Sequence, residues 1–254
     1  MPEPVHAVLF DFSGTLMRAE SAERWVAAVS VEAGVALSEE QIRSWAVRLE
    51  DAGGLPGGRA PGHVPDRLRT AWDQRDLDPA AHRAAYTGLI MHAGWPWPEL
   101  ADALHRRSTR PQAWAPYPDT LRTLTALAER GIRTAVISNI GWDPRPVLDA
   151  HGVAGHLDDV LLSYEEGCCK PDPALFTAAC ARLGVLPRHT LMVGDNRTAD
   201  GGGEVVGIRT FYVDPLPVRE RPRGFAPMLG EALRAGDGPL GTEASITGSP
   251  CEAV

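Results

Sequence analysis

Lysine is almost absent from this sequence. Of the 25 lysine and arginine residues in the 254-residue chain, Lys170 is the only lysine, and it lies in the segment Cys-Cys-Lys-Pro-Asp-Pro at residues 168–173. A compact ammonium group suits a phosphate oxygen better here than the planar fork of a guanidinium group. The position of Lys170 therefore favours a role in binding phosphate, although a solvated surface lysine is the simpler alternative.

Several other features are lacking, and each absence excludes a class of protein. The formal net charge of -8 argues against a nucleic-acid or anionic-membrane partner, which would require a dominant basic surface. No apolar run approaches the roughly 18 residues that span a bilayer, and no secretion signal is visible at the N-terminus. The four cysteines have neither zinc-site spacing nor the density of a disulfide scaffold. We therefore expect a cytoplasmic protein with reduced thiols.

A helical region follows directly after the first strand of the sequence. The strand, residues 5–12, shows too little alternation for an exposed edge and is typical of a strand buried on both faces. Residues 20–116 are predicted to be all-helical and to form an inserted cap. Apolar spacing and capping signals predict its helices at 21–35, from Ser38 onward, 66–72, 79–92 and 98–106, with a flexible glycine- and proline-rich connector at 53–62.

Beyond residue 116 the sequence alternates between strand and helix patterns. Strands are predicted at 133–138, 159–163, 190–194 and 210–213, and helices at 119–130, 144–150, 173–183 and 199–206. This alternation implies right-handed crossovers and a doubly wound α/β fold with a parallel sheet. Residues 1–19 and 117–214 would form its core. Residues 215–254 are expected to be an extension with one docking helix at 225–233 and disorder after about residue 236.

Polar residues follow the ends of three predicted strands, where doubly wound sheets place their sites. Asp11 ends the first strand and is the candidate nucleophile, and Ser138-Asn139 offer a hydroxyl and backbone N–H groups to a phosphoryl oxygen. Lys170 precedes a helix N-terminus, which also favours an anion. Asp195 and Asp200 follow another strand and have the hard oxygen ligands that suit Mg²⁺.

These blocks resemble the haloacid dehalogenase superfamily, in the phosphatase-like branch whose helical cap of the C1 type follows the first strand. The residues that carry the resemblance are Asp11-Phe12-Ser13-Gly14-Thr15, Ser138-Asn139, Lys170-Pro171-Asp172-Pro173 and Gly194-Asp195 with Asp200. The resemblance implies attack of Asp11 on phosphorus, with Ser138, Asn139 and Lys170 holding the phosphate. It also implies Mg²⁺ bound by Asp11, Asp195, Asp200 and the carbonyl of Ser13.

Ser13 departs from the family pattern. Phosphatases of this family usually carry a second Asp there, which protonates the leaving group and later activates water. Serine cannot do this near neutral pH, and loss of a general acid-base costs about a hundredfold to ten-thousandfold in rate. A cap histidine among His63, His82, His92 and His105, the substrate itself, or a good leaving group could compensate for the loss.

The leading hypothesis is a magnesium-dependent phosphatase, a monomer or homodimer, that acts on a small phosphorylated metabolite. A phosphotransferase that uses the same intermediate and an impaired member that only binds a phosphorylated ligand remain as alternatives. Phosphonate hydrolysis of the family type requires a cap lysine, which this chain lacks. Haloacid dehalogenases usually carry a bulky residue at position 13 and lack the metal-binding acids, so the residues also argue against that activity.

Overall fold

The computed structural model describes residues 3–235 and divides into two compact units. Unit 1 contains the chain up to Arg18, Pro116–Ile140 and the chain from Leu148 onward, whereas unit 2 contains Ala19–Ala115 and Gly141–Val147. The main segment of unit 2 differs by one residue at each end from the predicted cap at 20–116. Unit 2 also contains residues 141–147, which the sequence assigned to the core. The predicted disorder after about residue 236 falls outside the described residues.

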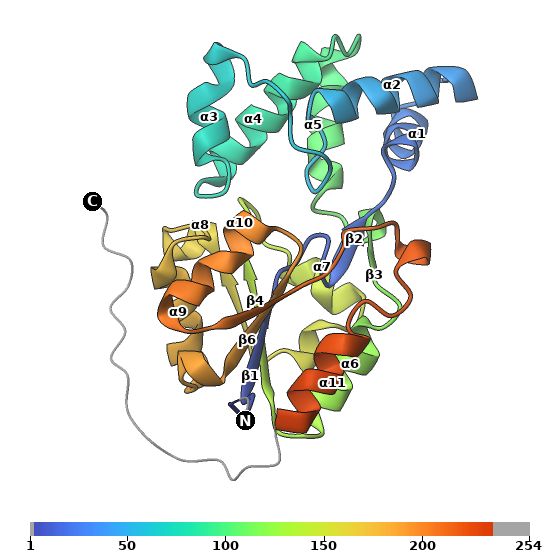
Figure 1. Ribbon diagram of the computed structural model, residues 1–254. Helices are drawn as coiled ribbons and strands as arrows, with labels where there is room; N and C mark the ends of the chain where they lie inside the picture. Colours follow the sequence, from blue (N-terminus) through green and yellow to red (C-terminus); the bar gives the residue numbers. More distant parts are fainter. Residues whose placement is uncertain (1–2, 236–254) are drawn as a thin grey trace. The chain divides into compact units, whose positions relative to one another are not determined.

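Unit 1 is built on a five-stranded sheet in the order β5-β4-β1-β6-β7, in which all neighbouring strands are parallel (Figure 1). The strands are β1 (Ala7–Phe10), β4 (Arg133–Ser138), β5 (Asp159–Leu162), β6 (Thr190–Gly194) and β7 (Arg209–Tyr212). After β1 the chain adds β4 and β5 on one side and then returns to add β6 and β7 on the other. This is the predicted doubly wound α/β fold, and the strand order reverses beside β1.

Both faces of the central strand β1 are covered, which explains its continuous apolar sequence. Leu9 packs in a cluster with α9 (Pro173–Leu183). The ring of Phe10 lies with its centroid 5.7 Å from that of Phe225, which precedes α11 (Ala226–Ala235). Helix α11 contacts α6 (Thr120–Ala128) (Figure 1). The predicted docking helix in the extension is therefore confirmed and belongs to the packed part of unit 1.

Unit 2 is formed mainly by helices whose apolar faces meet. They are α1 (Ala22–Glu32), α2 (Glu39–Asp51), α3 (Arg69–Gln74), α4 (Pro79–His92) and α5 (Pro98–Arg107). Helix α2 begins at the predicted capping box, in which Ser38 and Gln41 exchange side-chain and backbone hydrogen bonds. Trp25 and Trp95 are buried in the core of this unit. Their burial gives both a packing role within this unit.

The segment Gly141–Val147 packs within unit 2. A Cβ on Gly141 would lie 2.1 Å from the backbone oxygen of Arg75, so no larger residue fits there without a shift. The ring of Trp142 lies with its centroid 6.0 Å from that of Trp114. Helix α7 (Arg145–Ala150) begins in this segment and ends in unit 1.

The prediction that residues 20–116 are all-helical is wrong at the C-terminal end. Trp114–Pro116 forms the strand β3, which pairs with β2 (Met17–Ala19) in a two-stranded sheet. Three residues are too few to produce a detectable sequence periodicity. The short helix α8 (Ser163–Glu166) was also missed because Ser163 was assigned to the preceding strand.

The predicted helix at 199–206 is replaced by two shorter elements. Helix α10 (Arg197–Asp200) ends at the first of three consecutive glycines, and the chain continues as a 3₁₀ helix over Gly201–Val206. Glycine is a poor α-helix former, which explains the early end of α10.

The expectation of reduced thiols holds in part. Cys180 is a free cysteine buried in α9, but Cys168 is disulfide-bonded, so the expectation is wrong there. None of the helices in the described part of the chain is long and apolar enough to cross a bilayer.

Candidate active site

The carboxyl ends of β1, β4 and β6 place the candidate residues at one edge of the sheet. Phe10 pairs in register with Val136 of β4 and with Val193 of β6. Asp11 therefore follows β1 at the level where Ser138 ends β4 and Asp195 follows β6. The backbone N–H of Asp11 also donates to the carbonyl of Val193 at 2.9 Å, which fixes the nucleophile candidate against β6.

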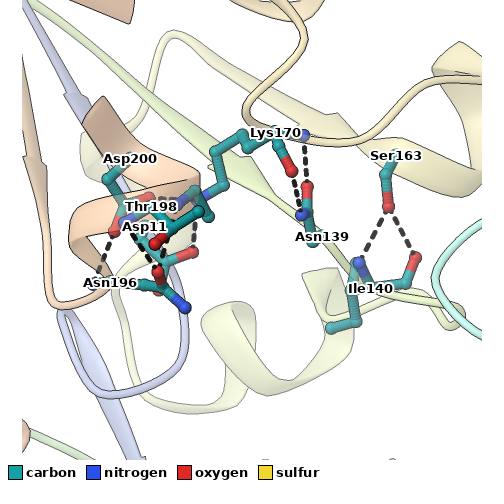
Figure 2. Close-up of polar contacts among 9 residues, drawn as sticks. Asp11, Asn139, Ile140, Ser163, Lys170, Asn196, Thr198 and Asp200 are labelled. Carbon is teal, nitrogen blue, oxygen red and sulfur yellow. Dashed lines mark hydrogen bonds and ion pairs between the residues drawn. The ribbon is translucent and has the colours of Figure 1, made fainter. Parts of the chain in front are cut away.

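Lys170 joins two of these carboxylates. Its Nζ lies 2.7 Å from Oδ1 of Asp11 and 2.7 Å from Oδ1 of Asp200, and all three side chains are almost completely buried (Figure 2). The sole lysine of the chain is thus a buried ammonium and not a solvated surface group. Oδ2 of Asp11 accepts no hydrogen bond from the described residues, so one oxygen of this carboxylate remains available for attack.

Burial and the charges of neighbouring side chains determine the protonation of Asp11, Asp195 and Lys170. Burial, opposed by Lys170 and reinforced by the nearby Asp200 and Asp195 carboxylates, raises the pKa of Asp11 to about 7. Burial also raises the pKa of Asp195, to which Asp200 adds. For Lys170, burial disfavours the ammonium, but the Asp11 and Asp200 carboxylates outweigh it and raise its pKa. Three carboxylates therefore surround one ammonium, which leaves an excess of negative charge.

Two glycines let the acidic side chains approach the backbone. A Cβ on Gly14 would lie 2.5 Å from Oδ2 of Asp195, and a Cβ on Gly194 would lie 2.0 Å from Oδ2 of Asp200. Gly14 also has a φ of +83°, which disfavours any other residue. Close packing at the site thus requires the glycines at positions 14 and 194.

The turn from Asp195 to Asp200 is fixed by its own hydrogen bonds. Oδ2 of Asp200 accepts from the backbone N–H of Asn196 at 2.9 Å. The side chain of Asn196 in turn caps α10 by accepting from the N–H groups of Thr198 and Ala199 (Figure 2). Both carboxylate oxygens of Asp200 are therefore engaged. Its prediction as a direct metal ligand stays a prediction, and its observed contacts are with Lys170 and Asn196.

Asn139 has a role that the sequence did not indicate. Its side-chain amide donates to the carbonyl of Lys170 and accepts from the N–H of Lys170, both at 2.7 Å (Figure 2). The hydroxyl of Ser163 similarly accepts from the N–H of Ile140 at 2.9 Å. The two contacts tie the loop after β4 to the segment that carries Lys170. The side chain of Asn139 thus positions Lys170, and only its backbone N–H remains as a phosphate-binding candidate beside the buried Ser138.

Ser13 lies in the loop after Asp11 and is partly exposed. Its carbonyl accepts no hydrogen bond from the described residues, whereas the carbonyls of Phe12 and Gly14 both accept one. No group of three or more His, Cys, Asp or Glu side chains in the described chain has metal-binding geometry. A ligand set of two carboxylates and one backbone carbonyl is compatible with this result, because Mg²⁺ takes few protein ligands and keeps several waters.

Comparisons with known proteins agree with this geometry. A model of the haloacid dehalogenase-like hydrolase family matches residues 5–203. The chain belongs to this family. Its sheet order, the placement of Asp11 and Asp195 at strand ends, and the contact of Lys170 with Asp11 are consistent with the family resemblance of the four sequence blocks.

Relatives of the chain within the haloacid dehalogenase-like hydrolase family are named for different activities. A phosphoserine phosphatase of Thermus thermophilus is 38% identical over 144 residues, which cover 55% of this chain and 53% of the relative. The chain therefore spans about half the length of that relative. A glyceraldehyde 3-phosphate phosphatase of Methanopyrus kandleri is 30% identical over 203 residues, covering 77% of this chain and 78% of the relative.

The fold alone does not distinguish between activities in this family. The structure of an L-2-haloacid dehalogenase from Xanthobacter autotrophicus has a TM-score of 0.60 and 21% identity, covering 90% of this chain and 88% of that one. Family membership places the chain among the haloacid dehalogenase-like hydrolases, and the residues at the site must indicate which reaction it would catalyse.

The four cap histidines fall into two groups within unit 2. His82 and His105 are buried, and Nδ1 of His82 lies 2.8 Å from Nε2 of His105. Burial is the main cause that lowers their pKa values, to about 3 for His82 and about 4 for His105. His63 and His92 are exposed. Two of the four are therefore packing residues held in the neutral form.

Proposed function

We propose that this protein is a magnesium-dependent phosphatase that hydrolyses a small phosphorylated metabolite through a phosphoaspartate on Asp11. The observation that carries the proposal is the buried Asp11–Lys170–Asp200 arrangement with one oxygen of Asp11 unengaged. Two of the relatives described above are phosphatases by name. The presence of Asp195 and Asp200 also favours phosphate over the metal-independent dehalogenation of haloacids.

Mg²⁺ fits the chemistry of the donors at this site. Asp11, Asp195 and the carbonyl of Ser13 would hold it, and Asp200 would act through Lys170. When bound, the ion supplies positive charge that stabilises the oxygens of the transferred phosphoryl group. The donors leave an excess of negative charge around Lys170, which a divalent cation would offset.

The residues of the chain would act in two chemical steps. Oδ2 of Asp11 forms a bond to phosphorus as the bond to the leaving oxygen breaks, and the leaving oxygen takes a proton from solvent. Water then attacks phosphorus and gives up one proton to solvent, the Asp11–phosphorus bond breaks, and free phosphate and the Asp11 carboxylate result. Lys170 and the Ser138 hydroxyl would hold the transferred phosphoryl oxygens, and Asn139 would keep Lys170 in place.

Replacement of the nucleophile tests this mechanism. Asp11→Asn should abolish release of phosphate from p-nitrophenyl phosphate and from a panel of sugar phosphates, because an amide is not a competent nucleophile. The matched control is Asp149→Asn, which changes an exposed residue of α7 and should retain full activity. Circular dichroism checks that both variants fold. Turnover by Asp11→Asn at the wild-type rate would overturn the mechanism.

A second candidate function is phosphoryl transfer to an acceptor other than water. Ser13 favours it, because without an acid-base carboxylate the phosphoaspartate reacts slowly with water and has time to meet another acceptor. The Ser13→Asp variant should raise hydrolysis tenfold or more if the serine limits water attack. The measurement is the ratio of phosphorylated acceptor to free phosphate when glycerol or a free sugar is added. Transfer that exceeds hydrolysis in the wild type, and falls in Ser13→Asp, would favour the transferase.

A further inference from the structure

Arg221 is a buried cation in unit 1 that the proposed mechanism does not use. It lies in the extension, beyond the residues 5–203 that match the family model. Its side chain is 5% exposed and forms no ion pair among the described residues. Burying an unpaired charge costs several kcal/mol in general. A position with this cost requires compensating contacts.

These contacts are made with the loop that carries the nucleophile. Nη1 of Arg221 donates to the carbonyl of Gly14 at 2.7 Å, and Nη2 donates to the carbonyl of Thr15. Nη1 also lies 3.2 Å from the carbonyl of Asp214. The guanidinium group stacks on the ring of Tyr117, with Cζ 3.1 Å from the ring centroid. Arg221 therefore links the extension to the loop after β1.

The remaining carbonyls of this loop are engaged by other donors. The carbonyl of Phe12 accepts from the N–H of Met17, and that of Leu16 accepts from the N–H of Tyr117 and the hydroxyl of Thr120. Arg221 occupies the carbonyls of Gly14 and Thr15. Among residues 12–16, as far as the structure describes their contacts, only the carbonyl of Ser13 is left without a donor. That carbonyl is the one assigned to the cation.

We propose that Arg221 is a positioning residue of the active site, which holds the loop at Gly14 and Thr15 so that the Ser13 carbonyl stays available and Gly14 packs against Asp195. The assignment to catalysis rests on the proposed function, whereas the ordering of the loop does not. The C-terminal extension is then part of the catalytic unit, although it lies outside the family match.

Removal of the guanidinium group tests the proposal. Arg221→Met should lower kcat for p-nitrophenyl phosphate about tenfold to a hundredfold, because small misplacements of reacting groups have effects of this size. KM should change less than threefold. The variant should also need at least tenfold more Mg²⁺ for half of the maximal rise in melting temperature. Hydrogen exchange of the peptide covering residues 11–17 should become faster, a readout that needs neither substrate nor metal.

Two control variants separate positioning from stability. Arg223→Met removes an exposed arginine of the same extension and should match the wild type in every readout. Met228→Ala removes a fully buried side chain of α11 and should lower the melting temperature, while kcat and the Mg²⁺ midpoint stay within twofold of the wild type. Arg221→Lys should restore less than half of the lost kcat, because an ammonium lacks the planar fork that spans two carbonyls.

The failures of the two proposals are distinguishable. Unchanged hydrogen exchange at residues 11–17 in Arg221→Met would overturn the positioning role, whatever the activity. Equal losses of kcat in Met228→Ala and Arg221→Met would also overturn it, because a general loss of stability would then explain both. If the wild type neither hydrolyses phosphate esters nor responds to Mg²⁺, the proposed function fails, and hydrogen exchange still decides whether Arg221 orders the loop.

Discussion

Lys170 is the residue on which the charge balance of the site depends. Its ammonium contacts Asp11 and Asp200 at 2.7 Å each, and no other lysine exists in the chain to replace it. The same contacts that position the nucleophile also neutralise it. Because Asn139 holds the backbone of Lys170 through two hydrogen bonds, the ammonium has little freedom to leave this position.

Lys170→Met should destabilise the protein by about 3–5 kcal/mol, because it leaves two buried carboxylates without their cation. The measurement is urea unfolding followed by circular dichroism. Addition of Mg²⁺ should recover part of this loss, since a divalent cation replaces some of the missing charge. The control Arg43→Met removes an exposed helix ion pair with Glu39 and should cost less than about 0.5 kcal/mol. Equal stability of the wild type and Lys170→Met would contradict the charge balance described here.

At the scale of secondary-structure elements, α4 and α5 meet through the pair His82–His105. Both imidazoles are buried, and the ring of Tyr86 lies 4.6 Å from that of His82, centroid to centroid. The contact requires one of the two facing nitrogens to be unprotonated, and burial disfavours the charged form of either ring. The contact between the two helices therefore depends on pH.

The lowered pKa values of the two histidines determine whether stability rises or falls with pH. The folded-state pKa of His82 is about 3, below its ordinary value of 6.5, so below pH 6.5 the unfolded chain binds protons that the folded chain excludes. Stability is fully present above pH 6.5 and falls toward pH 4. His82→Phe should reduce the rise of the unfolding free energy with pH by about 1.4 kcal/mol per pH unit between pH 4 and 6. The control His92→Asn changes an exposed position and should keep the pH dependence of the wild type, as measured by urea unfolding at several pH values. If His82→Phe also kept that dependence, His82 would not be its source.

Elements with strong local signals were predictable from the sequence. The structure places β4, α4, α9 and β6 at the predicted residues, because their apolar periodicity and the prolines that begin α4 and α9 are local properties. The contact between Arg221 and Gly14 joins residues 207 positions apart, and no local pattern indicates it. The packing of Trp142 within unit 2 depends in the same way on tertiary contacts. The sequence therefore located the strand-end residues of the site but not the residues that hold them.

At the scale of the whole molecule, the extension divides into a packed part and a part beyond the described residues. Phe225, Met228 and Ala232 are fully buried, and Arg221 contacts the loop after β1. The packed part therefore contributes to the core of unit 1 and cannot be treated as a tail.

Truncation at two positions tests this division. A chain that ends at Val213 should lose at least about 3 kcal/mol of stability, the typical cost of removing one buried aromatic side chain, together with its activity. In a reducing buffer, a chain that ends at Ala235 keeps α11 and should match the full-length protein in both. The measurement is thermal unfolding alongside phosphate release. Full stability of the chain that ends at Val213 would show that the extension is dispensable.

The polypeptide passes between the two units four times, at residues 18/19, 115/116, 140/141 and 147/148. In a chimera that exchanges only Ala19–Ala115 for the matching segment of a relative, Gly141 and Trp142 of this protein remain. The backbone of Arg75 and the ring of Trp114, against which they pack, are then lost. Exchange of unit 2 for that of a relative thus requires two grafts at once, and homologous recombination at a single pair of crossover points would yield mismatched chains.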